Sequence, residues 1–197
     1  MRHLWRAIAA ILLTVCCAGK AEAQNWGIKG GVNLGDVKWG TEVLDSKMSI
    51  SPVGGAFWRW KPAKFLDLQF EGLVAQLVID LSEEGAELKE TLTLLQVPVL
   101  FKYTIVNREA VKVRAHGGAS FDALLLARDE VNGESFDIRD AFAPWGASLV
   151  AGAEVDWHRW VFDGRYVFGL TDLYHPDIAE TLPAKQRSIQ ITAGFRF

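Results

Sequence analysis

One segment of the chain carries three side chains that could together hydrolyse an ester or amide. His116, Ser120 and Asp122 share one parity in a stretch where polar and apolar residues alternate. A histidine, a serine and a carboxylate within hydrogen-bonding reach would form a nucleophilic site. In an extended strand, however, His116 and Ser120 lie about 13 Å apart, at roughly 3.3 Å per residue. The three cannot act alone, although a neighbouring strand could supply a partner such as Ser148.

Charged side chains of both signs share the polar face of the alternating segments. On each segment they lie opposite the large apolar residues, which puts the two classes on different faces of a sheet. If such a sheet closes into a barrel, we expect these side chains to form a polar network in its lumen. The network would contain Arg59, Glu71, Lys102, Arg114, His116, Asp122, Glu154, Asp163, Arg165 and Arg196. Its acids and bases could pair with one another inside a barrel, or they could be solvated on the outside of one.

Eight segments alternate with a period of two, which predicts eight β-strands. They cover residues 26–35, 48–60, 66–79, 92–103, 111–122, 143–157, 160–170 and 187–197. Long polar connections alternate with short turns, so the two kinds of connection fall at opposite ends of an up-and-down antiparallel sheet. The long ones are predicted at 36–47, 80–90, 128–140 and 172–186.

Aromatic residues indicate which face of this sheet meets lipid. Alternation alone does not, because a soluble lipocalin-like barrel has its apolar side chains inside and a membrane barrel has them outside. An aromatic belt is predicted near the short turns, formed by Trp26, Trp58, Trp60, Tyr103, Trp157 and Trp160. Such belts are typical of membrane interfaces. Phe197 ends the chain in register with apolar Ile189 and Ile191. We therefore predict an all-β, eight-stranded antiparallel up-and-down transmembrane β-barrel over residues 24–197.

The first 23 residues predict a secretory signal peptide that is cleaved after Ala23. Arg2 and Arg6 precede an apolar run of about 12 residues, which is shorter than the roughly 20 that a spanning helix needs. Val15 precedes Cys16 where a lipoprotein signal has a small residue, so removal is favoured over lipidation. Cleavage changes the net charge from −3 to −5. Without a basic surface, the mature chain is not expected to bind nucleic acid.

Four stretches carry a resemblance to a known family. They are WGIKGGVNLGDV from residue 26, LQVPVLFKY from residue 95, GRYVFGLTDL from residue 164 and the closing RSIQITAGFRF. In this order they resemble the porin-like outer-membrane β-barrel proteins of the Bacteroidetes type, which include secretion-associated PorT-like proteins. The resemblance implies a Gram-negative outer membrane, contact with its lipid, and recognition of Phe197 by the barrel-assembly machinery. It also suggests a place in a secretion or surface complex, and it implies no substrate.

The expected function is structural anchoring or loop-mediated binding, with side chains filling the lumen. Eight strands enclose an interior just wide enough for side chains, which argues against a wide pore. Three alternatives stay open: a narrow porin-like channel, a small outer-membrane enzyme that modifies lipid A, and a soluble lipocalin-like periplasmic carrier. No His-x-x-x-His or two-cysteine spacing in the mature chain indicates a metal, and no cofactor motif is found. We expect no enzymatic activity.

Overall fold

The computed structural model describes residues 25–39, 49–83, 86–131, 134–175 and 184–197. The predicted signal peptide lies outside these residues. The strands are β1 (Trp26–Trp39), β2 (Ser49–Trp60), β3 (Leu66–Glu83), β4 (Ala86–Asn107), β5 (Val111–Val131), β6 (Glu134–Asp137), β7 (Trp145–Trp157), β8 (Trp160–Gly169) and β9 (Ala184–Arg196). A short 3-10 helix, η2 (Arg139–Ala141), follows β6. No helix within the described ranges has the length and apolarity needed to cross a membrane.

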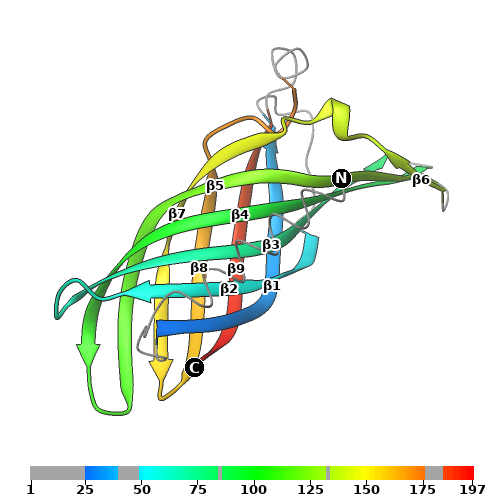
Figure 1. Cartoon of the computed structure of the whole chain (residues 1–197). Helices are drawn as coiled ribbons and strands as arrows, with labels where there is room; N and C mark the ends of the chain where they lie inside the picture. Colours follow the sequence, from blue (N-terminus) through cyan, green and yellow to red (C-terminus); the bar gives the residue numbers. More distant parts are fainter. Residues whose placement is uncertain (1–24, 40–48, 84–85, 132–133, 176–183) are drawn as a thin grey trace, which may run out of the picture.

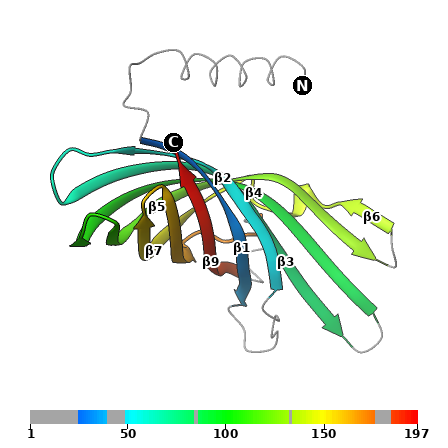
Figure 2. The same ribbon diagram turned by 90° about the horizontal axis from the view of Figure 1, so that it is seen from below.

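Eight of these strands form a closed antiparallel barrel. The sheet runs β4-β3-β2-β1-β9-β8-β7-β5-β6, and the additional pairing of β4 with β5 closes it. Consecutive barrel strands are neighbours, so the topology is up-and-down. The remaining strand, β6, pairs only with the last residues of β5 and extends past the body of the barrel (Figures 1 and 2). The predicted fold is confirmed, with β6 as an addition.

The barrel wall is apolar outside and polar or charged inside over its short-turn half. Exposed and buried side chains alternate strictly along β8. On β9, Ile191 is 53% exposed, whereas Arg165 on the neighbouring β8 is 3% exposed. A soluble carrier barrel would have the opposite arrangement, because water would then be outside. The lipocalin-like alternative is therefore wrong.

Two of the predicted long connections are largely strand. The segment 80–90 continues β3 to Glu83 and begins β4 at Ala86, and the two strands stay paired up to the Glu83–Ala86 pair. The segment 128–140 contains the end of β5, all of β6 and part of η2. In the sequence, polar residues occur at both odd and even positions of these segments, which hides the period of two. The backbone amides and carbonyls of these segments are nevertheless paired between strands. The hairpin strands therefore extend beyond the segments that show alternation in the sequence.

A β-bulge explains why the alternation on β5 breaks down in a run of leucines. Thr93 of β4 pairs with Leu126, but the next residue, Leu94, pairs with Leu124. Leu125 is thus an extra residue on β5. The shift lets both Leu124 and Ala127 turn into the barrel, although regular alternation would put residues at this odd spacing on opposite faces.

An apolar cluster lies inside the long-connection half of the barrel. Its buried members are Leu77, Leu92, Leu94, Leu124, Ala127, Phe142 and Ala184. The segment after η2 contributes Phe142, which stacks on Tyr174 with ring centroids 4.7 Å apart and forms an isolated β-bridge with it. The Tyr174 hydroxyl donates to Glu90 Oε2 at 3.3 Å. Burial, together with the Glu90 carboxylate, raises the pKa of Tyr174.

Candidate functional site

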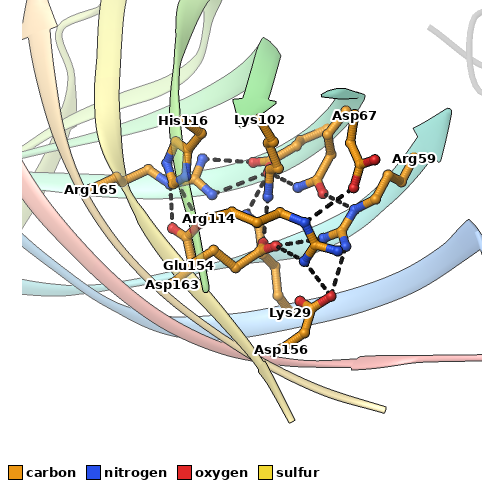
Figure 3. Close-up of polar contacts among 12 residues, drawn as sticks. Lys29, Arg59, Asp67, Lys102, Arg114, His116, Glu154, Asp156, Asp163 and Arg165 are labelled. Carbon is orange, nitrogen blue, oxygen red and sulfur yellow. Dashed lines mark hydrogen bonds and ion pairs between the residues drawn. The ribbon is translucent and has the colours of Figure 1, made fainter. Parts of the chain in front are cut away.

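The interior of the short-turn half holds a buried ionic network, shown in Figure 3. Its members come from β1, β2, β3, β4, β5, β7 and β8, because each strand turns alternate residues into the lumen. Five buried bases are present: Lys29, Arg59, Lys102, Arg114 and Arg165. Five buried acids accompany them: Asp67, Glu71, Glu154, Asp156 and Asp163. The fixed charges of these ten residues cancel.

The first group of contacts surrounds Glu154 and Asp156 on β7. Arg59 on β2 reaches both acids, with Nη2 2.7 Å from Glu154 Oε1 and Nη1 3.0 Å from Asp156 Oδ2. Lys102 on β4 donates to the other oxygen of Glu154. Arg114 on β5 also donates to both acids. Each oxygen of the buried Glu154 carboxylate is thus bound by at least one cation.

The second group surrounds Glu71 on β3. Arg165 on β8 binds it with two nitrogens, at 2.7 Å from Oε2 and 3.1 Å from Oε1. This two-point geometry is the strong form of an arginine–carboxylate pair. Lys29 adds a third contact at 2.6 Å. Arg165 Nε also donates to Asp163 at 2.7 Å, and His116 Nε2 lies 3.7 Å from the other oxygen of Asp163.

Gln69 joins the two groups. It accepts from Arg59 Nε at 3.0 Å and donates to Glu71 Oε1 at 2.5 Å. An amide suits this position because it has both a donor and an acceptor. Lys29, Asp67, Gln69 and Asp156 were not in the predicted network. Their inward placement follows from the same alternation that placed the others, so the signal was present in the sequence.

Several of these contacts cross the lumen. In the closed order, β2 and β7 stand four places apart, as do β3 and β8, so each pair faces across the barrel. Arg59–Asp156 and Glu71–Arg165 therefore span its width. Farther along, Gln190 Nε2 on β9 donates to Gln96 Oε1 on β4 at 2.9 Å, again between strands four places apart. The lumen is bridged at three successive levels.

The predicted network residues fall into three places. Seven lie in the ionic network, and His116 is beside Asp163. Arg196 stands at the rim, where it reaches Asp156 at 3.0 Å and the carbonyl of His158 at 2.9 Å. Asp122 is separate, because it lies six residue steps from His116 along β5, about 20 Å at roughly 3.3 Å per step. Its carboxylate accepts from Ser120 at 2.6 Å and from Ser148.

The predicted aromatic residues lie at the short-turn rim. Trp60 ends β2, and Trp157 and Trp160 flank the turn between β7 and β8. All three, like Tyr103, are about half exposed on the outer wall, whereas Trp26 and Trp58 are half-buried. Phe197 donates its backbone N–H to the carbonyl of Trp26 at 2.9 Å, which ties the chain end to the start of β1.

Metal ligands do not gather in the part of the chain that the structure describes. No group of three or more histidine, cysteine, aspartate or glutamate residues there is arranged to hold a metal ion.

Comparison with known proteins gives a family and a fold. Residues 21–175 match the family model described as outer membrane protein beta-barrel domain. A comparison with curated protein sequences gives no match. Among solved structures, Neisserial surface protein A is 13% identical over 87% of this chain and 97% of that protein, with a TM-score of 0.54. Ail of Yersinia pestis is 18% identical over 88% of this chain and 99% of that protein, with a TM-score of 0.49. OprG from Pseudomonas aeruginosa is 12% identical over 89% of this chain and 96% of that protein, with a TM-score of 0.47.

Proposed function

The chain belongs to the outer membrane protein beta-barrel domain family, and from that premise we propose that it is a membrane anchor that presents its long connections outside the cell. The protein is an integral outer-membrane barrel. In such barrels the short turns face the periplasm and the longer connections face outward. The proposed role is therefore structural, or binding through the long connections, rather than passage of solutes.

The bridged lumen carries this proposal. Charged pairs cross it in the short-turn half, Gln96 and Gln190 cross it farther along, and apolar side chains lie beyond them. A solute would have to break contacts between buried charges, which costs several kcal/mol. These contacts favour an anchor over a narrow porin-like channel.

Conductance in planar bilayers tests the proposal. The refolded protein is expected to give no large, stable current steps. The double variant Glu71→Ala/Arg165→Ala is the comparison protein. It removes one bridge across the lumen without changing the net charge, and it should pass more current than the wild type. Heat-modifiable migration on gels checks that both proteins are inserted. Large stable steps from the wild-type protein would instead identify a channel.

The proposal includes a route to the membrane. The first 23 residues act as a signal peptide cleaved after Ala23, and Phe197 is the residue that the barrel-assembly machinery binds. Sequencing the N-terminus of the membrane-embedded protein tests the cleavage, with Gln24 as the expected first residue. Within the family, the resemblance to PorT-like proteins of the Bacteroidetes supports a partner in a secretion or surface complex. Co-purification of a secretion component from mild detergent would support this partner.

The proposal also excludes catalysis on lipid A. Ser120 and Ser148 donate their hydroxyl hydrogens to Asp122, and His116 lies beside Asp163, so these three residues are not arranged as base and nucleophile. His116→Ala is expected to leave the lipid A of the host cell unchanged in its mass spectrum. A changed acylation pattern would favour the enzyme alternative.

A further inference from the structure

We propose that the long-connection half of the barrel contains a binding pocket for a small organic ammonium ion, with the Asp122 carboxylate as its counter-ion. The ligand class is a primary amine on a compact apolar body. This inference goes beyond the anchoring role and does not depend on it, because a pocket at one end of a blocked lumen needs no passage through the barrel.

The charge of Asp122 is the first observation. Its side chain is 6% exposed, and among the described residues its hydrogen bonds come from the hydroxyls of Ser120 and Ser148 alone. Every acid of the ionic network has a cationic partner, and the five buried bases there already match the five buried acids. The network has no spare base for Asp122. A buried carboxylate is costly without a cation, and its two oxygens can accept further hydrogen bonds.

A small cavity beside this carboxylate is the second observation. Its volume is about 30 Å³, and Asp122, Ser148 and Gln186 contribute polar groups to its lining. A space of this size holds one or two groups as large as water, and an ammonium group is such a group. Asp172 also lines the cavity, and its Oδ1 is buried without a hydrogen-bond donor among the described residues. Within that part of the chain, two carboxylates and no base therefore line a cavity that fits a cationic head.

The apolar surroundings define the rest of the ligand. Leu92, Leu94 and Leu173 line the same cavity. Leu124 and Phe142 line both this cavity and a larger cleft of about 620 Å³ on the side of the long connections. Pockets for small molecules measure about 300–1,000 Å³. An amine whose head reaches Asp122 could pack its body against Leu124 and Phe142 and extend into this cleft.

The test measures binding of cyclohexylammonium to the full-length mature protein in nanodiscs, by ligand-observed NMR titration. Cyclohexanol, which has the same body without the charge, serves as the probe of apolar binding alone. Cyclohexylammonium is expected to bind at least tenfold more tightly than cyclohexanol. Asp122→Asn keeps the shape of the side chain and should reduce cyclohexylammonium binding at least tenfold.

Asp140→Asn is the matched control, because Asp140 is an exposed acid that lines the outer cleft and not the cavity beside Asp122. It should change the affinity by less than twofold. Three results would overturn the proposal: no binding of cyclohexylammonium, equal binding of cyclohexanol, or a loss with Asp140→Asn that Asp122→Asn does not produce. If Asp122→Asn does not fold, the comparison of the two ligands on the wild-type protein still decides the question.

Discussion

At the scale of single residues, Glu154 is the fully buried acid of the ionic network that has three cationic partners. It is fully buried and bound by Arg59, Lys102 and Arg114. The negative charge of the Glu154 carboxylate compensates the positive charges of these three buried bases. Burial of charge is in itself costly, so the network is better explained as a device that fixes one packing of the lumen than as a net source of stability.

Neutralising this residue should destabilise the barrel. Glu154→Gln leaves at least one buried cation without a counter-charge, and loss of one partner of a buried pair costs about 3–5 kcal/mol. The measurement is the free energy of unfolding in urea, for protein inserted in lipid vesicles. Glu109→Gln, in the exposed turn between β4 and β5, is the control and should change that free energy by less than about 0.5 kcal/mol. Equal effects of the two variants would contradict the importance of the network.

At the scale of the elements, a glycine allows the neighbouring strands β4 and β5 to pair closely. Gly118 turns toward the lumen, and a Cβ atom there would lie 2.0 Å from the carbonyl oxygen of Val99 on β4. The adjacent Gly117 faces outward, and a Cβ atom at that position would have its nearest neighbour 3.6 Å away. Of these two glycines, Gly118 is the one whose surroundings leave no room for a side chain.

This difference predicts opposite outcomes for two neighbouring substitutions. Gly118→Ala must push the two strands apart and should lower the free energy of unfolding by about 1–3 kcal/mol, as overpacking does. Gly117→Ala should change it by less than about 0.5 kcal/mol. Both changes in unfolding free energy can be measured by urea titration, with heat-modifiable migration on gels as the readout. A tolerated Gly118→Ala variant would show that β4 and β5 can move apart at little cost.

The strands could be predicted from the sequence wherever one face meets lipid, because there the period of two is strict. Phe162, Tyr166 and Phe168 on β8 illustrate this. The prediction failed at 80–90 and 128–140, where polar residues occupy both odd and even positions and the sequence shows no period of two. It also could not place Leu125, since a bulge depends on the register of the partner strand. Alternation predicted that the ionic side chains point into the barrel. It could not predict which acid pairs with which base, because most of the ion pairs join strands that are distant in sequence.

At the scale of the whole molecule, the apolar wall matches a membrane in height. β7 runs from Trp145 to Trp157, both of which are exposed. Twelve steps of about 3.3 Å give about 40 Å along the strand. At a tilt of about 40°, this corresponds to about 30 Å along the barrel axis, close to the roughly 25 Å apolar band of such barrels. The two tryptophans therefore mark the two interfaces.

Depth in the membrane should then set the effect of an added charge. Ile191 lies midway along β9 and Ile50 near the long-connection end of β2, and both are exposed on the outer wall. Ile191→Arg is expected to cost about 2–4 kcal/mol and Ile50→Arg about 0–1 kcal/mol in vesicles. Unfolding titrations in lipid measure the difference. Similar costs at the two positions would contradict this placement of the bilayer.

The bridges across the lumen have a consequence for how the protein enters the membrane. Arg59 and Asp156 are 97 residues apart in the chain, and Glu71 and Arg165 are 94 residues apart. None of these partners can meet until the first and last strands have joined. An open, half-inserted sheet would leave bare charges facing hydrocarbon, which lipid excludes. Insertion and ring closure should therefore occur as a single concerted event, with no stable halfway species in the bilayer.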